Sequence, residues 1–386
     1  MRPQSFRFFF FVVLTFMGTA LSLQASASMV PRAPQIDARG YLLMDAASGH
    51  IIVEHNAEQR LPPASLTKMM TAYIAEAELQ KGNLSEDDMA PISVKAWKMG
   101  GSRMFVKEGT RVSVGDLLKG IIIQSGNDAS VAMAEYIAGS EDAFADLMNQ
   151  HARRLGMNQS HFMNATGWPA ENHFTTARDM AILARAIVRD FPEHYDIYAE
   201  KEFTYNGITQ QNRNLLLWRD ESVDGLKTGH TEEAGYCLVS SAKKDGMRLI
   251  AVVMGTDSEG ARARESQKLL TYGFRFFETY KAYSAGDILD TAELWMGDKD
   301  QVRLGLAEDL VLTIPRESHE NLKAEVTVNP QLQAPINEGE KYGTVTVRMN
   351  NELLVEKPLV ALESVEEAGL FTRLWHHILL FFKGLF

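Results

Sequence analysis

The order of hydrophobic and polar positions predicts strands at the start of the chain and helices after them. Residues 40–44 and 50–55 are short apolar runs separated by a few small residues, a pattern typical of two strands joined by a tight turn. From Leu66 the apolar residues recur with a helical period that leaves one buried stripe. Ser113 and Asp116 are spaced as the capping pair of another helix. The remaining helices are predicted at residues 113–123, 129–137, 141–155 and 176–188.

Strand patterns return after this helical region. Residues 234–242 and 247–254 flank Asp245-Gly246, which is a strong signal for a β-hairpin. A closing helix is predicted at residues 263–280. A block with strands at both ends and helices in the middle indicates the α+β class, with an antiparallel sheet that carries a large helical insertion.

From residue 284 the pattern changes to alternation, which predicts a small all-β domain. Leu322, Ala324, Val326 and Val328 alternate with polar residues, and a second such run follows at residues 345–349. The segment 282–286 would join this domain to the first block. It contains no cluster of catalytic residue types, so a spacer or an interaction module is the favoured interpretation.

The C-terminal stretch 369–386 has the pattern of a cationic amphipathic helix. It is too short and too polar to span a membrane but suited to lie in the interface. The alternative is a helix that packs on the all-β domain. The apolar side consists of Leu370, Phe371, Leu374, Ile378, Phe381, Phe382 and Leu385.

The N-terminus has the pattern of an export signal. Arg2 and Arg7 precede an apolar stretch at residues 8–23, and Ala25-Ser26-Ala27 offers a small-residue cleavage site. A retained membrane helix is the alternative, but the stretch falls short of the roughly 20 apolar residues that a span requires. We therefore expect residues 1–27 to be a signal peptide that is removed.

Length, charge and cysteine content narrow the possible domain organisation, partners and stabilising bonds of the protein. The 386 residues suffice for two domains, and we place their boundaries at 28–281 and 282–362, with the terminal helix at 363–386. The net charge of −11 argues against nucleic acid as a partner, because phosphate binding relies on basic surfaces. Cys237 is the only cysteine, so no intrachain disulfide forms, and its apolar neighbours favour a buried small side chain over a nucleophile.

The first candidate for chemistry is the pair Ser65 and Lys68, three residues apart at the start of a helix and so on one face. A serine needs a base to become a nucleophile, and a lysine serves as one when burial or nearby positive charge lowers its pKa. The Ser-x-x-Lys pattern arises by chance in a chain of this length. It recurs at residues 240–243 and 241–244, which we interpret as solvated hairpin residues.

Two further motifs complete the constellation. Ser125-Gly126-Asn127 lies between two predicted helices, where Ser125 would relay a proton and Asn127 would hold a substrate amide. A helix cap is the competing interpretation of this triplet. Lys227-Thr228-Gly229 precedes the hairpin and is predicted on an edge strand, where Gly229 lets a substrate backbone approach. Lys227 would supply positive charge and Thr228 a hydroxyl.

With these three motifs in this order, the sequence resembles the penicillin-binding serine DD-peptidases, and most closely the D-alanyl-D-alanine carboxypeptidases of low molecular mass. The resemblance covers nearly the whole chain after the leader. It is also carried by QSGNDA at 124–129, TARD at 176–179, KTGHTEEAGY at 227–236 and GFRFFE at 273–278.

The resemblance implies that Ser65 attacks the bond between two terminal D-alanines of a peptidoglycan stem pentapeptide, with Lys68 as base. Ser125 would pass the proton to the leaving amine, and the backbone N–H groups of Ser65 and His230 would form the oxyanion hole. Arg262 best matches the family's arginine for the substrate carboxylate.

Several alternatives stay open from the residues alone. Arg264 would replace Arg262 after a small shift of register, and Arg213 is a second candidate that could simply brace the cleft. A β-lactamase would share the motifs and add a glutamate on a loop between the second and third motifs to activate water. Glu202 and Asn206 have the Glu-x-x-x-Asn spacing, but no glutamate between Asp128 and Leu226 has such a loop setting, so we expect slow turnover of β-lactams. A DD-endopeptidase would use the same residues. A noncatalytic scaffold that binds peptidoglycan is the alternative from another class, and a Ser-His-Asp triad is disfavoured because Ser65 lacks the Gly-x-Ser-x-Gly turn.

The same resemblance implies the substrates, the inhibitors and the location of the protein. Peptidoglycan stem peptides are the expected substrates, and β-lactam antibiotics are the expected covalent inhibitors. We expect no cofactor and no metal, because the sequence has no His-Glu-x-x-His pattern and no cysteine cluster. The chain would work at the periplasmic face of the inner membrane, held peripherally by its C-terminus.

Overall fold

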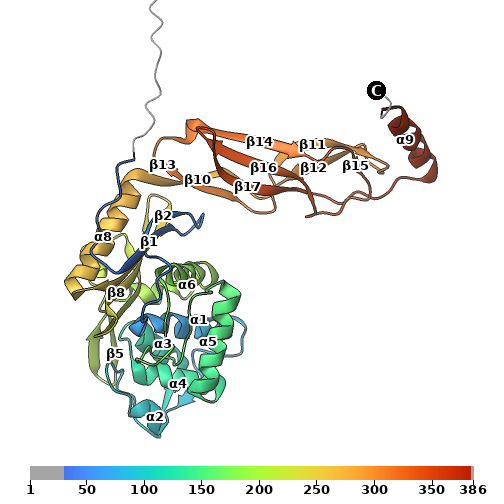
Figure 1. Ribbon diagram of the computed structural model, residues 1–386. Helices are drawn as coiled ribbons and strands as arrows, with labels where there is room; N and C mark the ends of the chain where they lie inside the picture. The colour runs from blue at the N-terminus through green and yellow to red at the C-terminus, as the bar shows by residue number, and fades with distance from the viewer. Residues whose placement is uncertain (1–29, 384–386) are drawn as a thin grey trace, which may run out of the picture.

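The protein has an α+β part and an elongated β part that ends in a helix. The computed structural model describes residues 30–383, so the predicted signal peptide lies outside the described residues. Figure 1 shows the elongated part projecting from one end of the α+β part, next to helix α8 (Glu259–Phe276). This arrangement confirms the predicted fold class.

The α+β part is built on a five-stranded antiparallel sheet with the order β2-β1-β9-β8-β7. The predicted hairpin at Asp245-Gly246 is confirmed, and both turn residues have positive φ, as such a turn requires. The third motif lies on β7, which is the edge strand that the sequence predicts. The bounds are β1 Gly40–Asp45, β2 Ile51–His55, β7 Val223–Thr231, β8 Gly235–Lys244 and β9 Met247–Thr256.

The sheet separates two hydrophobic cores because alternate residues of its strands face opposite sides. On β1, Leu42 packs with the helical region, whereas the adjacent Leu43 packs with α8. β9 is buried on both faces, and Val252 and Val253 divide between the two cores in the same way. The result is a three-layer domain, with the helices on one face and α8 on the other.

The helical layer matches the predicted helices closely. The hydroxyl of Ser113 accepts a hydrogen bond from the N–H of Asp116 at 3.1 Å, which confirms the predicted cap. The bounds of the longer helices are α1 Lys68–Gln80, α3 Val114–Ile122, α4 Asn127–Ala138, α5 Glu141–Leu155 and α6 Ala177–Asp190. The short elements are η1 Ala64–Thr67, β3 Met89–Pro91, α2 Val94–Trp97, β4 Arg111–Ser113, η2 Tyr195–Ala199, β5 Glu202–Tyr205, β6 Ile208–Gln211 and α7 Leu216–Arg219.

The prediction of one helix over residues 263–280 is wrong at its C-terminal end. Helix α8 ends at Phe276, and the chain continues directly as strand β10 (Phe277–Tyr283), which pairs with β13 (Leu310–Pro315). The predicted domain boundary between residues 281 and 282 therefore falls inside a strand of the elongated part.

The elongated part is an all-β structure with its own hydrophobic core, as its alternating pattern predicts. The two predicted runs are strands β14 and β16, which pair in antiparallel register. The bounds of the remaining elements are β11 Ile288–Trp295, β12 Gln301–Gly305, η3 His319–Asn321, β14 Leu322–Val328, β15 Leu332–Gln333, β16 Lys341–Met349 and β17 Glu352–Ala361.

A buried carboxylate connects the two parts. Asp45, at the end of β1, is fully buried and accepts hydrogen bonds from the hydroxyls of Thr279 at 2.7 Å and Thr313 at 2.8 Å. The hydroxyls of Thr313 and Ser48 lie 2.6 Å apart. Because these partners come from both sides of the junction, the contact holds the two parts together through charge-assisted hydrogen bonds.

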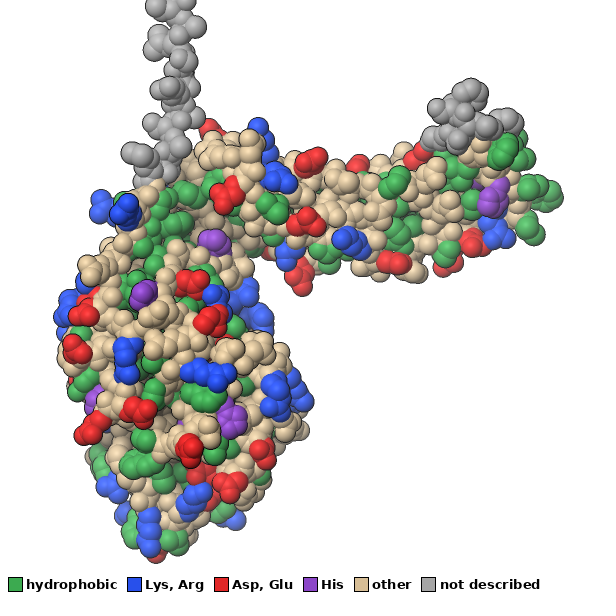
Figure 2. All heavy atoms as spheres, in the orientation of Figure 1, with side chains coloured by type: hydrophobic (Ala, Val, Ile, Leu, Met, Phe, Trp, Pro, Cys, Tyr) green, Lys and Arg blue, Asp and Glu red, His purple; other side chains and the backbone are tan. Residues whose placement is uncertain are grey.

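Helix α9 (Leu370–Lys383) starts later than the predicted terminal helix at 363–386. Val365 bridges to Ile336, and the N–H of Ala368 donates to the carbonyl of Met296, so this stretch belongs to the β part. Figure 2 shows hydrophobic side chains gathered at the end of the molecule where α9 lies. Within residues 30–383, no helix is long and apolar enough to cross a membrane.

A carboxyl group is buried beside a tyrosine hydroxyl inside the helical layer. Glu76 of α1 is fully buried next to Tyr198, and within residues 30–383 neither side chain makes a hydrogen bond of good geometry. Burial raises the pKa of Glu76 to about 8. The carboxyl is therefore held in its protonated form at neutral pH.

We predict that Glu76 makes the stability of the fold fall as pH rises. Folded Glu76 keeps its proton up to about pH 8, whereas an unfolded glutamate loses it near 4.5. Between these values the free energy of unfolding should fall by up to about 1.4 kcal/mol per pH unit. Urea unfolding of Glu76→Gln across this range should show a flatter dependence. As a control, Glu78→Gln on the same helix should keep the slope, and an unchanged slope in Glu76→Gln would contradict the assignment.

Candidate active site

The three sequence motifs meet in one cleft of about 830 Å³ between the edge strand β7 and the helical layer. Lys68 and Lys227 lie beneath it, with exposed fractions of 1% and 3%. The predicted residues that line the cleft are Ser65, Ser125, Asn127, Arg213, Thr228, Gly229, His230 and Arg262. The structure thus brings together all of the predicted site residues except the alternative Arg264.

Ser65 and Lys68 are positioned by the start of α1. Ser65 sits in the 3₁₀ turn η1, and Lys68 is the first residue of α1. The Nζ atom of Lys68 lies 3.0 Å from Oγ of Ser65 and donates to the carbonyl oxygen of Thr166 at 2.6 Å. This is the distance at which an amine takes a proton directly from a hydroxyl.

The surroundings of Lys68 favour its neutral form. Burial, assisted by the positive charge of Arg213, lowers the pKa of Lys68 to about 7, while Asp128 opposes the shift. A substantial fraction of the amine is therefore unprotonated at neutral pH and able to act as a base.

A second serine and lysine face the first pair. The Nζ atom of Lys227 donates to Oγ of Ser125 at 2.8 Å and to the carbonyl oxygen of Thr228 at 3.1 Å. Burial and the nearby positive charges of Lys68 and Arg213 lower the pKa of Lys227 well below its ordinary value. These surroundings disfavour the positive charge expected of Lys227, and the negative charge of a substrate carboxylate would favour it.

Asn127 is not in a loop, as its position between two predicted helices suggested, because α4 begins at this residue. Its side-chain N–H donates to the carbonyl oxygen of Gly100 at 2.7 Å, which fixes the orientation of the amide. A Cβ atom on Gly101 would lie 2.9 Å from the Nδ2 atom of Asn127. The glycine therefore allows the wall of the cleft to pass close to this amide.

Asp128 organises the opposite wall of the cleft. Its carboxylate accepts hydrogen bonds from the backbone N–H groups of Met104, Phe105 and Val106 at 2.8, 2.8 and 3.1 Å. It also accepts from the N–H of Ala129 at 2.9 Å, but the N-cap residue of α4 is Gly126, so the interpretation of Ser125-Gly126-Asn127 as a side-chain cap is wrong. Sequence reasoning missed the contacts of Asp128 with the loop because these partners lie more than 20 residues away.

The loop that contacts Lys68 is built around Asn164, which sequence reasoning also missed. The Oδ1 atom of Asn164 accepts from the N–H groups of Thr166, Gly167 and Trp168, a short-range pattern that Asn-x-Thr-Gly could have suggested. Gly167 has φ of +81°, and a Cβ atom there would lie 1.7 Å from the carbonyl oxygen of Ala64. Only glycine lets this loop lie against the turn that carries Ser65.

Close packing also sets β7 beside the nucleophile. A Cβ atom on Gly229 would lie 3.1 Å from the carbonyl oxygen of Pro63 and 3.3 Å from the backbone nitrogen of Leu66. The strand therefore runs directly alongside η1. This places the backbones of Ser65 and His230, the predicted oxyanion hole, in the same cleft.

The structure distinguishes between the candidate arginines. Arg262 is buried with its side chain in the cleft, donates to the carbonyl oxygen of Gly229 at 3.3 Å and lies over the ring of Tyr236. Arg213 lines the cleft and is exposed. Arg264 lies outside the cleft, in a groove along α8, so the structure places Arg262 and not Arg264 among the residues that line the cleft.

Other potential sites are not evident in the described part of the chain. Cys237 is buried, which raises its pKa to about 11, in agreement with its prediction as a small apolar side chain. Among residues 30–383, no three His, Cys, Asp or Glu side chains come together in a way that could hold a metal ion.

Comparisons with known proteins agree with the fold. A family model described as D-alanyl-D-alanine carboxypeptidase matches residues 27–258, and one described as the C-terminal domain of penicillin-binding protein 5 matches residues 277–367. The chain is 46% identical over 369 residues to D-alanyl-D-alanine carboxypeptidase DacC of Escherichia coli, covering 94% of this chain and 92% of that protein.

Solved structures show the same likeness. Penicillin-binding protein 5 from Haemophilus influenzae superposes with a TM-score of 0.85 at 42% identity, covering 87% of this chain and all of that chain. Penicillin-binding protein D2 from Listeria monocytogenes, in an ampicillin-bound form, gives a TM-score of 0.59 at 27% identity and covers 63% of this chain and all of that chain.

We predict that two charges near Lys68 shift the pH dependence of Ser65 reactivity in opposite directions. Asp128→Asn removes a charge that raises the pKa of Lys68, so the rise in acylation rate with pH should move to lower pH. Arg213→Gln removes a charge that lowers this pKa and should move the rise to higher pH. The measurement is the rate of labelling by a fluorescent penicillin at a series of pH values. Shifts in the same direction, or none, would contradict Lys68 as the titrating base.

Proposed function

This chain belongs to the D-alanyl-D-alanine carboxypeptidase family of serine peptidases, and we propose that Ser65 is the nucleophile that releases the terminal D-alanine from peptidoglycan stem pentapeptides. The family assignment makes the protein a serine-type DD-carboxypeptidase. The observation that supports the role of Ser65 most directly is the buried amine of Lys68, 3.0 Å from its hydroxyl.

Acylation requires the removal of a proton from Ser65 and the delivery of a proton to the leaving amine. Neutral Lys68 takes the proton of Ser65 as Oγ attacks the carbonyl carbon of the D-alanyl-D-alanine bond, and the negative charge goes to the carbonyl oxygen. The backbone N–H groups of Ser65 and His230 stabilise this oxygen. When the C–N bond breaks, the leaving amine must gain a proton. Ser125, whose hydroxyl faces the cleft 2.8 Å from Nζ of Lys227, relays it. Ser125 gives its own proton to the amine and regains the proton that Lys68 took from Ser65, which returns Lys68 to its neutral form.

The substrate carboxylate is recognised at the far end of β7. Thr228 offers a hydroxyl, and Arg262 is a buried cation whose guanidinium is aligned by the carbonyl of Gly229. A carboxylate here would favour the protonated form of Lys227 and complete a cationic pocket. Arg213, at the exposed edge, attracts the carboxylate and helps to keep Lys68 neutral.

β-Lactams acylate the same serine, since their strained amide presents a carbonyl and a carboxylate in a similar arrangement. The ampicillin-bound relative supports this part of the proposal. Because the loop 164–174 provides no Glu-x-x-x-Asn pattern, we expect the penicilloyl adduct to be long-lived.

We propose that the enzyme is exported through residues 1–27 and rests on the periplasmic face of the inner membrane through α9. The support is the exposure of apolar side chains on α9, where Phe371 is 91% exposed and Trp375 is 59% exposed. Helix α9 meets the β part through His376, which accepts a hydrogen bond from the N–H of Met296 at 2.8 Å and lies against the ring of Trp295, but this contact leaves the rings of Phe371 and Trp375 exposed. An amphipathic helix with exposed aromatic residues lowers its free energy by lying in a membrane interface.

The catalytic proposal is tested with protein that lacks residues 1–27 and 370–386, which keeps the strand pairing at Val365. Wild type should bind fluorescent penicillin covalently and release D-alanine from diacetyl-Lys-D-Ala-D-Ala. Ser65→Ala should lose both activities by at least about a thousandfold. Ser240→Ala, which removes the hydroxyl of one of the two other Ser-x-x-Lys patterns, is the matched control and should keep both. The interpretation of these two serines as solvated is wrong, since Ser240 and Ser241 are buried in β8.

Two outcomes would change this conclusion. Labelling without D-alanine release would keep Ser65 as nucleophile and move the substrate to cross-linked peptides, as in a DD-endopeptidase. If a folded protein gives neither covalent labelling nor D-alanine release, the hypothesis of a noncatalytic scaffold remains.

The membrane proposal predicts that α9 carries the binding to lipid. In flotation with phosphatidylglycerol-containing vesicles, protein starting at residue 28 should float with the lipid, and protein ending at residue 369 should not. Phe371→Glu combined with Trp375→Glu should abolish flotation while Ser65 labelling stays unchanged. Equal flotation of the truncated protein would place the membrane contact elsewhere.

A further inference from the structure

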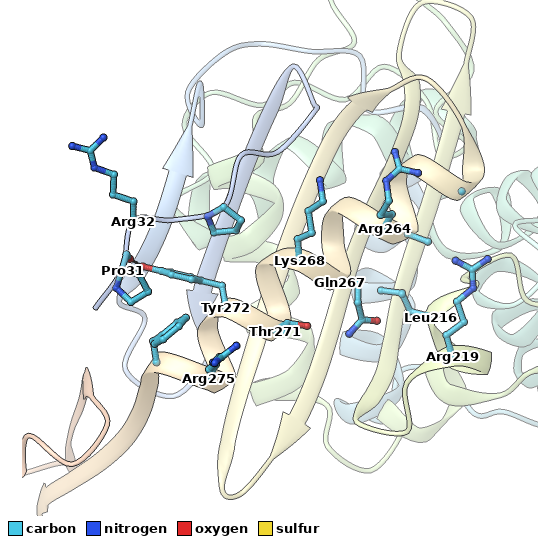
Figure 3. A pocket seen from close by; sticks show the side chains of 14 residues that line it. Pro31, Arg32, Leu216, Arg219, Arg264, Gln267, Lys268, Thr271, Tyr272 and Arg275 are labelled. Atoms are coloured by element: carbon cyan, nitrogen blue, oxygen red, sulfur yellow. Dashed lines mark hydrogen bonds between the residues drawn. The ribbon is translucent and has the colours of Figure 1, made fainter. Parts of the chain in front are cut away.

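A second large groove lies on the opposite side of the sheet from the helical layer, along the outer face of α8. This groove, the α8 trough, has a volume of about 800 Å³. Figure 3 shows its floor on α8 at residues 260–276, one wall formed by the segment 31–34, and the other by α7 at Leu216 and Arg219. The hydroxyl of Tyr272 donates to the carbonyl of Pro31 at 2.9 Å, which fixes the first wall.

The trough is a local cationic surface on an acidic protein. Its lining includes five cationic side chains and no Asp or Glu, although the whole chain has a net charge of −11. Two of the cations, Arg264 and Lys268, share the carboxylate of Glu265. The other three, Arg32, Arg219 and Arg275, are exposed and make no ion pair within residues 30–383. The trough thus keeps a positive charge that attracts an acidic partner.

The floor between these charges is apolar. Ala263 and Leu216 are buried, and the rings of Tyr272 and Phe276 are partly exposed at one end. A ligand that fills the trough must therefore offer apolar groups to the floor and negative charges to the rim. A purely polar anion would leave the floor in contact with water.

The cations are spaced too far apart for a single small anion to be the occupant of the trough. Arg264 and Arg275 are eleven residues apart on one helix, about 16 Å along its axis. The lined length of α8, residues 260–275, is about 22 Å, or about four helical turns. A single phosphate cannot contact charges at this separation, whereas a peptide can.

The geometry selects a helix over an extended peptide and over a membrane. An extended strand gains its affinity from main-chain hydrogen bonds with a free sheet edge, and α8 offers none. The proposed membrane contact, α9, lies at the far end of the β part from α8 (Figure 1). An amphipathic helix needs only a groove with an apolar floor and a complementary rim.

We propose that the α8 trough is a docking site for an acidic amphipathic helix of a partner protein. Leucine-like side chains of this helix would contact the floor, and its carboxylates would pair with Arg32, Arg219 and Arg275. The bound helix would end beside Gly260, two residues before Arg262. A partner in the trough would therefore contact the helix that carries an arginine of the catalytic cleft.

The test uses a synthetic peptide helix of about 15 residues, with leucines along one face and glutamates on the other. Binding is measured by fluorescence anisotropy with protein that lacks residues 1–27 and 370–386. A scrambled peptide of the same composition has the same charge but no continuous leucine face, so it measures binding by charge attraction alone. Inorganic phosphate and phosphatidylglycerol vesicles are added as competitors.

Three variants distinguish binding in the trough from general electrostatic attraction to the protein. Arg32→Glu, Arg219→Glu and Arg275→Glu combined should weaken binding at least about tenfold. The matched control, Lys107→Glu, Arg153→Glu and Arg154→Glu combined, makes the same charge change at exposed positions outside the trough and should change binding far less. Thr271→Trp fills the exposed middle of the floor without a change of charge and should also block binding.

All variants should keep wild-type D-alanine release or penicillin labelling, which shows that they are folded and separates this test from that of the catalytic proposal. The proposal is overturned if the peptide does not bind, if the scrambled peptide binds equally well, or if both charge-reversal variants weaken binding alike. Displacement by phosphate alone, or by vesicles at the same residues, would assign the trough to an anion or to lipid and would also overturn it.

Discussion

The burial of the Lys68 amine is the constraint on which the active site depends. The Lys68 side chain has an exposed fraction of 1%, and its removal from water destabilises the charged form, which lowers its pKa to about 7 and suits the amine to the proposed role of base. The carbonyl oxygen of Thr166 accepts its hydrogen bond and orients it toward Ser65. Any change that admits water to this position would return the amine to its cationic form.

Several segments that lie far apart in the sequence together enclose this amine. The loop at 164–168 closes over it only because Gly167 lacks a side chain, and Asn164 holds the loop through three backbone N–H groups. On the opposite wall, Asp128 orders residues 104–106 and moderates the pKa of Lys68. Stability and reactivity are therefore coupled, since the segments that these hydrogen bonds order also supply the burial and the charge that set the pKa of Lys68.

The sequence predicted the parts of this structure that local physics determines. The hairpin at Asp245-Gly246, the Ser113 cap and the edge position of Lys227 each follow from short-range signals, and the structure agrees with them. The end of α8 did not follow, because residues 269, 270, 273, 276, 277 and 280 keep an apolar helical spacing. Pairing of Phe277–Tyr283 with β13 overrides that spacing, and such a partner is visible only in three dimensions.

The residues of the site also divide into those that local sequence signals predict and those that depend on long-range contacts. Ser65, Lys68, Ser125 and Lys227 were recognised because each motif combines a reactive side chain with a particular local setting. The contacts of Asp128 and the buried carboxyl of Glu76 depend on residues distant in sequence, so no spacing reveals them. The choice between Arg262 and Arg264 needed the register of α8, which places one side chain in the cleft and the other in the trough.

A measurement of the Lys68 pKa in the free enzyme would decide whether this amine is a neutral base beside Ser65. Protein labelled with ¹³C at the lysine side chains would be titrated by NMR, with the Lys68 signal assigned from Lys68→Arg. We expect a midpoint near 7 for this signal. A midpoint close to the ordinary lysine value of about 10.4 would show a cationic Lys68 and would contradict its role as the base.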